Sequence, residues 1–229
     1  MTEPRDVSAA DALAAQARFY DLYAPDYVNP LAPTNRRVHD PLDPTAAADL
    51  VDRLAPEGDV LELACGPGGF TAELARRASS VTAVDASPRM LARNRIEVDQ
   101  PNVSYVLADA FDWRPEQRYD FVFFGFWLSH VPPARFDDFW HGLRTCIRDG
   151  ARVAFVDEDD RSRTNDDVRV ENDIPLAPRR LPDGRTLDVI KVFWEPAELT
   201  ARLHRLGWTF DIRRYHDIFM HGEGTLTRD

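Results

Sequence analysis

The fold is decided by one stretch, Val60-Leu61-Glu62-Leu63-Ala64-Cys65-Gly66-Pro67-Gly68-Gly69-Phe70-Thr71. A short apolar run is followed by a glycine-rich turn and then by helix-forming residues, an order that predicts strand, turn and helix. Gly66 and Gly68 carry no side chains, so a ligand can lie close to the backbone there. The first amides of the helix have no partners within it and point toward that ligand. The stretch therefore predicts a ligand site at the carboxyl end of a strand.

The charge of the turn separates two kinds of adenosine-containing cofactor. A dinucleotide fingerprint needs a third glycine at the position where this chain has Thr71. A dinucleotide also presents a pyrophosphate, which the carboxylate of Glu62 at the strand end would repel. That carboxylate would attract an ammonium or sulfonium group. The turn therefore favours a cationic cofactor and disfavours a nicotinamide-dependent oxidoreductase, which is kept as a competing hypothesis.

The segments around this stretch alternate between strand-like and helix-like patterns from residue 44 to residue 157. This alternation predicts a parallel sheet that is covered by helices on both faces. The predicted strands are residues 59–63, 81–84, 103–107, 120–126 and 152–156. The predicted helices are residues 46–54, residues 70–78, a helix that begins at Pro88 with Ser87 as its N-cap, and residues 135–147, ended by Asp149-Gly150.

The pattern changes after residue 157. Residues 157–167 read as a polar, acidic loop, and Pro182-Asp183-Gly184 predicts a hairpin within residues 181–192. A helix over 195–206 and strands over 209–214 and 217–220 then close an antiparallel edge of the sheet. Residues 1–43 contain several tyrosines and are predicted to pack over the sheet as a partly helical arm. We expect a single domain over residues 1–229, with an arm at 1–43, a core at 44–157 and a substrate-side part at 158–229.

The composition weighs against several classes of protein. The 229 residues carry a net charge of −11, which weighs against nucleic acid as a partner, because binding to phosphates depends mainly on Lys and Arg. No run approaches the length of about 18 apolar residues that crosses a membrane, and the N-terminus resembles no signal peptide. The two cysteines have no metal-ligand spacing and suit a reducing compartment. We expect a soluble, cytoplasmic protein with no metal site.

The glycine-rich stretch resembles motif I of the class I S-adenosylmethionine-dependent methyltransferases, an acid followed by x-Gly/Ala-x-Gly-x-Gly. The resemblance covers roughly residues 44–157. It implies a Rossmann-like α/β fold with a seven-stranded sheet that is mostly parallel, an antiparallel C-terminal edge and an N-terminal lid. It also implies S-adenosyl-L-methionine as cofactor and S-adenosyl-L-homocysteine as product.

Further positions support this resemblance at the ends of the next strands. Asp85 lies 19 residues after Gly66, where an acid can accept both ribose hydroxyls. The resemblance places Met90 against the adenine, and it makes Asp109 a partner of the adenine amine; the alternative for either aspartate is a helix-capping or structural role. The arm tyrosines would close over the cofactor, or else pack as an ordinary amphipathic arm. The predicted cofactor-binding residues are Tyr27, Glu62, Ala64, Gly66, Gly68, Asp85, Ala86, Met90, Asp109, Ala110, Phe111 and Phe126.

The resemblance places the methyl acceptor beside residues 125–132, after the fourth strand. This segment lacks the Asn/Asp-Pro-Pro-Tyr/Phe motif of relatives that methylate base amines and glutamine amides, and the chain lacks the cysteines of arsenic methylation. A hydroxyl acceptor needs a base, and His130 is the first candidate, with Asp157 and its acidic neighbours second and His39 a weaker third. The alternatives are a histidine bonded to a loop carbonyl and a solvated acidic loop. The predicted substrate-binding residues are Tyr23, Trp127, His130 and Trp194, although such aromatic residues also occur as ordinary core.

We therefore predict an enzyme that transfers methyl from S-adenosylmethionine to a small, ring-containing molecule. A hydroxyl oxygen of a metabolite is the first choice of acceptor, with nitrogen second and a carboxylate, which needs no base, third. The resemblance suggests a role in bacterial secondary metabolism. The alternative of another class is a protein that binds the cofactor without turnover.

Overall fold

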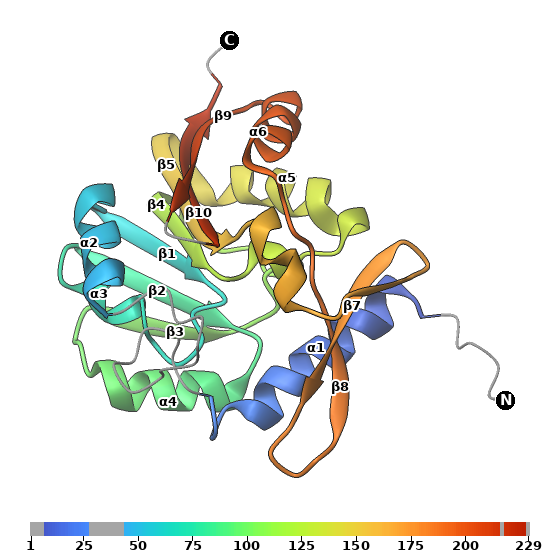
Figure 1. Ribbon diagram of the computed structural model, residues 1–229. Helices are drawn as coiled ribbons and strands as arrows, with labels where there is room; N and C mark the ends of the chain where they lie inside the picture. The colour runs from blue at the N-terminus through green and yellow to red at the C-terminus, as the bar shows by residue number, and fades with distance from the viewer. Residues whose placement is uncertain (1–6, 28–43, 216–217, 228–229) are drawn as a thin grey trace, which may run out of the picture.

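A central seven-stranded sheet organises the protein in the computed structural model, which describes residues 7–27, 44–215 and 218–227. The strand order is β3-β2-β1-β4-β5-β10-β9 (Figure 1). Strands β1 to β5 run parallel, and β10 runs antiparallel to both β5 and β9. The predicted fold class, with its antiparallel C-terminal edge, is confirmed. The strands are β1 (Asp59–Leu63), β2 (Ser80–Asp85), β3 (Val103–Leu107), β4 (Tyr119–Gly125), β5 (Ile147–Glu158), β9 (Trp208–Tyr215) and β10 (Phe219–Leu226).

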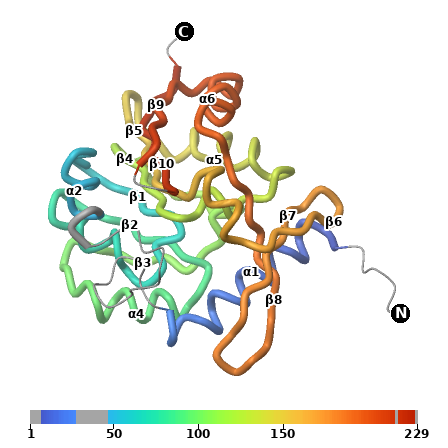
Figure 2. The backbone as a smooth tube through the Cα atoms, in the orientation of Figure 1, coloured from blue at the N-terminus to red at the C-terminus, as the bar shows by residue number. Residues whose placement is uncertain are grey.

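Helices cover both faces of this sheet because alternate strand side chains point to opposite faces. On β4, Phe121 and Phe123 belong to the core beneath α2 (Pro44–Leu54) and α3 (Thr71–Ala75). Val122 and Phe124 belong to the larger core beneath α5 (Phe136–Cys146) and α6 (Pro196–Arg205). The tube in Figure 2 shows α2 and α4 (Pro88–Val98) on one side of the sheet and α5 and α6 toward the other.

A second, three-stranded antiparallel sheet lies beside the N-terminal helix. Its strands are β6 (Arg169–Glu171), β7 (Ile174–Arg180) and β8 (Thr186–Ile190), so the hairpin predicted around Pro182-Asp183-Gly184 is confirmed, while β6 was not predicted. Helix α1 (Ala9–Tyr23) begins at Ser8, whose side chain and Asp11 form a capping box. Phe19 of α1 packs on apolar residues of the hairpin. Figure 1 shows α1, the helix of the predicted lid, running alongside this sheet.

Two predicted boundaries are wrong at the start of β5. Asp149-Gly150 does not end the preceding helix, which stops at Cys146, and the chain enters β5 at Ile147. The pairing with β4 shifts between Tyr119 and Phe121, so the extra residues of β5 form a bulge. Gly150, at φ +79°, supplies the left-handed conformation within it. Asp149-Gly150 therefore belongs to an irregularity in strand pairing rather than to the end of a helix.

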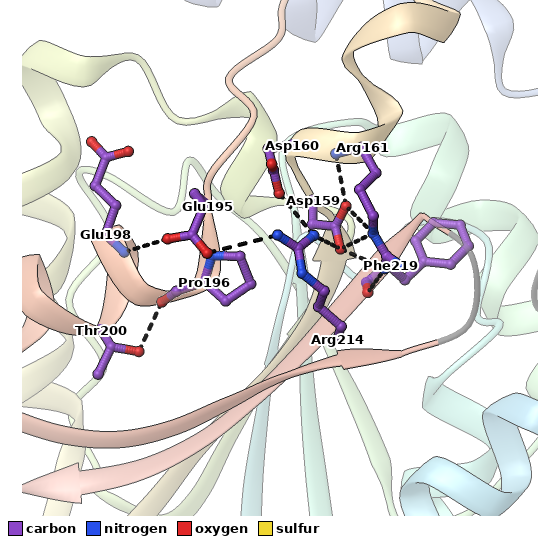
Figure 3. A network of polar contacts seen from close by, with 9 residues as sticks. All are labelled: Asp159, Asp160, Arg161, Glu195, Pro196, Glu198, Thr200, Arg214 and Phe219. Carbon is purple, nitrogen blue, oxygen red and sulfur yellow. Dashed lines mark hydrogen bonds and ion pairs between the residues drawn. The ribbon is translucent and has the colours of Figure 1, made fainter.

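The predicted acidic loop after β5 is also wrong, because Asp157 and Asp159 are buried. Figure 3 shows that Asp159 accepts hydrogen bonds from Arg161, at 2.6 Å from Nη2, and from Arg214 on β9, at 3.0 Å from Nη1. Two guanidinium groups compensate the carboxylate, which is how a charged group tolerates burial. The segment becomes the 3₁₀ helix η3 (Asp160–Asn165), fastened to the closing strands.

Candidate functional site

The glycine-rich turn folds as predicted, and the absence of a side chain has a different structural reason at Gly66 than at Gly68. Ala64 and Gly66 have positive φ angles of +51° and +52°. A Cβ built on Gly66 would meet nothing within 4 Å, so this glycine opens onto free space. A Cβ on Gly68 would lie 2.6 Å from Val98 Cγ2 and 2.9 Å from Asn94 Oδ1, both on α4. Gly66 therefore faces the ligand side, and Gly68 permits close packing of α4.

Glu62 lies behind this turn at 2 % exposure, away from the ligand cavity. Its Oε2 accepts a hydrogen bond of 2.6 Å from Thr71 Oγ1, and Asn94 Nδ2 donates to Thr71 Oγ1 at 2.9 Å and to the Gly66 carbonyl at 3.1 Å. Burial raises the pKa of Glu62 to about 8, which the Thr71 bond partly offsets. Thr71, the residue in place of a third glycine, is the hydroxyl that holds this carboxyl group.

A cavity with about 920 Å³ of empty space, counted to its open mouth, lies at the carboxyl ends of β1, β2, β3 and β4. Most of the predicted cofactor residues line it: Tyr27, Ala64, Gly66, Asp85, Ala86, Met90, Asp109, Ala110, Phe111 and Phe126. Glu62 and Gly68 do not. Residues of the lid helix close the cavity from above, namely Leu13, Gln16, Ala17 and Tyr20. The ends of β1, β2 and β3, with Gly66, Asp85 and Asp109, are thus brought together as the sequence predicts.

Two aspartates present carboxylate oxygens at this cavity. Asp85 accepts backbone N–H bonds from Gly66 at 2.9 Å and from Ser87 at 2.8 Å. Burial raises the pKa of Asp85, and these backbone bonds counteract the shift. Asp109 accepts one bond of 2.8 Å from the Phe111 N–H. A carboxylate has about four lone-pair sites, so both groups retain capacity for a ligand.

The lid helix is fastened at the cofactor side through α4. Asp21 accepts a hydrogen bond of 2.7 Å from Ser87 Oγ, the N-cap of α4. Arg93 of α4 donates from Nη1 to the carbonyls of Ala24 and Tyr27, both at 2.7 Å. These contacts join the end of the lid to the helix that follows Asp85.

His130 lines the cavity at the end predicted to hold the methyl acceptor, lies in the 3₁₀ turn η1 (Leu128–His130), and is 7 % exposed. Its Nδ1 is 2.7 Å from the Ile190 carbonyl, an acceptor only, so Nδ1 carries the proton and donates. Its Nε2 then accepts from the Tyr20 hydroxyl at 2.8 Å. Burial, together with the charges of Lys191 and Arg179, lowers the pKa of His130 well below its usual value. This histidine lines the cavity and bonds a backbone carbonyl, as its alternative interpretation expects, and its role as a base stays a prediction.

Asp157, the second predicted base, lies off the cavity at 1 % exposure. Its Oδ2 accepts from the Ser129 N–H at 2.8 Å and its Oδ1 from the Glu158 N–H at 2.7 Å. Burial raises the pKa of this carboxyl group. Asp157 thus holds the turn that carries His130.

The other predicted substrate residues divide between cavity and core. Trp127 lines the cavity with its ring centroid 5.5 Å from that of Phe111. Tyr23 stacks on Phe19 at 5.3 Å and lies off the cavity lining. Trp194 is 5 % exposed and packs on the Phe136 ring at 4.9 Å, within the core. His39 lies outside the described residues.

Sequence reasoning missed two cations that act on His130, one of them buried and the other partly exposed. Lys191, the only lysine of the chain, is 5 % exposed; its Nζ lies 2.6 Å from Glu158 Oε2 and 3.3 Å from Ser129 Oγ. Arg179 on β7 pairs with Asp166 at 2.7 Å. A lone lysine within the apolar run Ile190-Lys191-Val192 was the available signal.

Comparisons with known proteins agree with this geometry. A methyltransferase domain family matches residues 60–150. The solved structure of a DhpI–SAH complex is 34 % identical, has a TM-score of 0.80, and covers 97 % of this chain and 100 % of its own. A DhpI–SAM–HEP complex is 36 % identical with a TM-score of 0.79, covering 96 % and 100 %. The chain belongs to the class I S-adenosylmethionine-dependent methyltransferases, and its cofactor is S-adenosylmethionine.

Curated relatives match a shorter segment. A trans-aconitate 2-methyltransferase of Enterobacter sp. (strain 638) is 38 % identical over 90 residues, which is 38 % of this chain and 35 % of that protein. The same enzyme of Escherichia coli O139:H28 (strain E24377A / ETEC) is 40 % identical over 75 residues, or 32 % and 29 %. The match thus spans about a third of the length of these relatives.

Within residues 7–27, 44–215 and 218–227, no group of three or more His, Cys, Asp or Glu side chains is arranged to hold a metal ion. The helices of the same ranges include none that is both long and apolar enough to cross a membrane.

Proposed function

We propose that this enzyme methylates an acidic oxygen, a carboxylate or a similar oxyanion, of a small molecule. The observation that carries the proposal is a pair of cations that act on His130, the buried Lys191 and the partly exposed Arg179, which form ion pairs of 2.6 Å with Glu158 and 2.7 Å with Asp166. The proposal revises the order of acceptors expected from the sequence, where a neutral hydroxyl came first.

The state of the two predicted bases supports an acceptor that is already ionised. The Nδ1 proton of His130 is committed to Ile190, its Nε2 accepts from Tyr20, and its low pKa makes it a weak base. Both oxygens of Asp157 accept backbone bonds away from the cavity. An acid oxygen needs no proton removed, so it fits a site without a free base.

The charges near His130 support the same acceptor. Lys191 and Arg179 both disfavour a second proton on the imidazole, which means that the potential at His130 is raised by two cations. Arg179 also lowers the pKa of Tyr20, against the larger upward effect of burial. Each cation has an acidic partner, Glu158 or Asp166, and an acceptor acid can share or replace that ion pair.

On the cofactor side, the strand ends suit adenosylmethionine. We assign the two ribose hydroxyls to Asp85 and the adenine amine to Asp109, with Phe111 and Met90 against the adenine ring. Gly66 lets the cofactor approach the backbone. Glu62 lies behind the turn, and in its ionised form its negative charge attracts the cationic methionine end of the cofactor.

The chemistry then depends on alignment. Bound S-adenosylmethionine supplies an electrophilic methyl group for in-line displacement. The chain's part is to hold the acceptor oxygen at the acceptor end beside His130 and Tyr20, with water excluded by α1. Alignment of this kind contributes about 7–11 kcal/mol to the lowering of a barrier.

The relatives add support for small-molecule acceptors. Trans-aconitate, for which the curated relatives are named, is a tricarboxylate. We extend to this chain an acceptor of that chemical kind. We also propose that it has no nucleic acid partner, in keeping with the net charge of −11, and that it is located in the cytoplasm.

Arg179→Gln tests the proposal, with Arg185→Gln as the matched control on the tip of the same hairpin, where Arg185 pairs with Asp183. Formation of S-adenosylhomocysteine is measured with trans-aconitate and other small carboxylic acids, each beside its neutral amide. We expect turnover with acids only, and an acceptor KM about ten-fold or more higher in Arg179→Gln, because a hydrogen bond to a charged group contributes about 1.5–3 kcal/mol. Equal turnover of the amides, or identical KM values in the two variants, would refute the proposal.

A hydroxyl acceptor is the second candidate, and one observation favours it. His130 Nε2 already accepts from an O–H group, that of Tyr20, and a substrate hydroxyl in the same place would be positioned for proton transfer. For this candidate, His130→Ala loses turnover much more than cofactor affinity. Equal turnover of that variant across about pH 6–9 excludes the base role.

A further inference from the structure

Gln16 connects the lid to the acceptor end of the site through both the nitrogen and the oxygen of its side-chain amide. It lies on α1, lines the cavity and is 3 % exposed. Nε2 donates to the His130 carbonyl at 3.2 Å, and Oε1 accepts from the Ile190 N–H at 3.0 Å. A carbonyl only accepts and an N–H only donates, so these partners fix the orientation of the amide.

The two partners of Gln16 are also the residues that set the state of the imidazole. The Ile190 carbonyl accepts from His130 Nδ1, and Tyr20, four residues after Gln16 on the same helix face, donates to Nε2. The contacts form a closed cycle: Gln16 to Ile190, Ile190 to the imidazole, and the backbone of His130 back to Gln16. Displacement of α1 breaks the Gln16 and Tyr20 contacts together and leaves two buried backbone groups without partners.

We propose that Gln16 is a positioning residue that makes the orientation of His130, and with it the acceptor end of the site, depend on closure of α1. The lid then does more than cover the cofactor. It supplies Tyr20 and the amide that holds η1 against β8, so the acceptor end is complete only beneath a closed lid. The proposal relies on the proposed function only for placing the acceptor beside His130.

The test needs no acceptor, so its failure is distinguishable from failure of the proposed function. Imidazole ¹⁵N and ¹³C resonances of His130 are recorded with S-adenosylhomocysteine bound, assigned with His130→Gln. In the wild type we expect one neutral form with the proton on Nδ1, even at about pH 5.5, where a free histidine is protonated. In Gln16→Met we expect that form to be lost and His130 to be protonated at that pH. Gln100→Met, in an exposed turn, is the control and keeps the wild-type resonances.

Gln16→Glu tests the hydrogen bonds rather than the packing. The wild-type contacts of His130 should be kept at low pH in this variant and lost at high pH. When ionised, the carboxyl group that this substitution introduces accepts from Ile190 but turns its second oxygen toward the His130 carbonyl. When protonated, the same group donates to that carbonyl as the amide does. The groups that bias this equilibrium are His130, Tyr20, Lys191 and Arg179, and burial favours the protonated form. For Gln16→Glu we expect the His130 resonances of the wild type at about pH 5.5. At about pH 8 we expect the His130 resonances that Gln16→Met shows at the same pH.

Two results would overturn the proposal. The first is a Gln16→Met variant that binds S-adenosylhomocysteine and shows wild-type His130 resonances. The second is a Gln16→Glu variant whose His130 resonances are the same at both pH values, which decides the question even where Gln16→Met does not fold.

Discussion

Glu62→Gln tests the physical account of the turn most sharply, because the wild-type carboxyl group is buried and carries its proton near neutral pH. The pKa of Glu62 is about 8 in the folded protein, against 4.5 for an unperturbed glutamate. Between these values the folded chain binds more protons at this site than the unfolded chain. The free energy of unfolding therefore falls as pH rises from 4.5 to about 8.

The magnitude follows from the shift. One pKa unit corresponds to about 1.4 kcal/mol, and between about pH 6 and pH 8 the Glu62 contribution falls by about 2 kcal/mol, since the site is half ionised at the upper limit. Glutamine keeps an oxygen for the 2.6 Å bond from Thr71 but does not titrate. The stability of the wild type relative to Glu62→Gln should thus fall by about 2 kcal/mol over this interval.

The assay is urea unfolding of both proteins without cofactor at about pH 6 and pH 8, with the difference between proteins compared so that other titrating groups cancel. The reasoning would be refuted if the free energies of unfolding of the two proteins differed by the same amount at both pH values.

Because an ionised Glu62 attracts the ammonium of the cofactor, affinity for S-adenosylhomocysteine should rise with pH in the wild type more than in the variant. Calorimetric titration at the same pH values checks this second effect.

Three further predictions follow from the cavity. Gly66→Ala should weaken S-adenosylhomocysteine binding with a stability loss of only about 1–2 kcal/mol from the left-handed backbone, and calorimetry that finds full affinity would contradict it. Gly68→Ala should instead destabilise the fold by about 2–5 kcal/mol, because its Cβ would lie 2.6 Å from Val98, and an unchanged urea midpoint would be inconsistent with that packing. Asp85→Asn should weaken cofactor binding about ten- to hundred-fold, since two charge-assisted hydrogen bonds to the ribose are impaired, and a dissociation constant within about two-fold of wild type would count against the ribose assignment.

The sheet and the cofactor half of the site were predictable because their information is local. Each of the strands β1, β2 and β3 ends at or just before a feature that can be recognised in the sequence alone. These features are the glycine turn, Asp85 and Asp109. Parallel strands bring their carboxyl ends to one edge, so local patterns were enough to place these residues together.

The acceptor end and the ion pairs of Asp159 were not predictable in the same way because most of their contacts join distant segments. Asp159 reads as solvated until Arg161 and Arg214 are seen beside it, and the partner of His130 at Nδ1 is 60 residues away. Gln16 reads as one polar residue of an amphipathic helix, yet its partners lie 114 and 174 residues along the chain. Periodicity and motif spacing contain no information on such pairs.

Transfer of a ¹³C-labelled methyl group tests the central claim most directly. The purified enzyme is given S-adenosylmethionine labelled at its methyl carbon together with a small carboxylic acid that supports formation of S-adenosylhomocysteine. The carbon resonance of the product should be that of a methyl ester, and the label should be released as methanol by mild alkali. A label that resists alkali and has the resonance of an N-methyl or ether carbon would contradict the proposed acceptor.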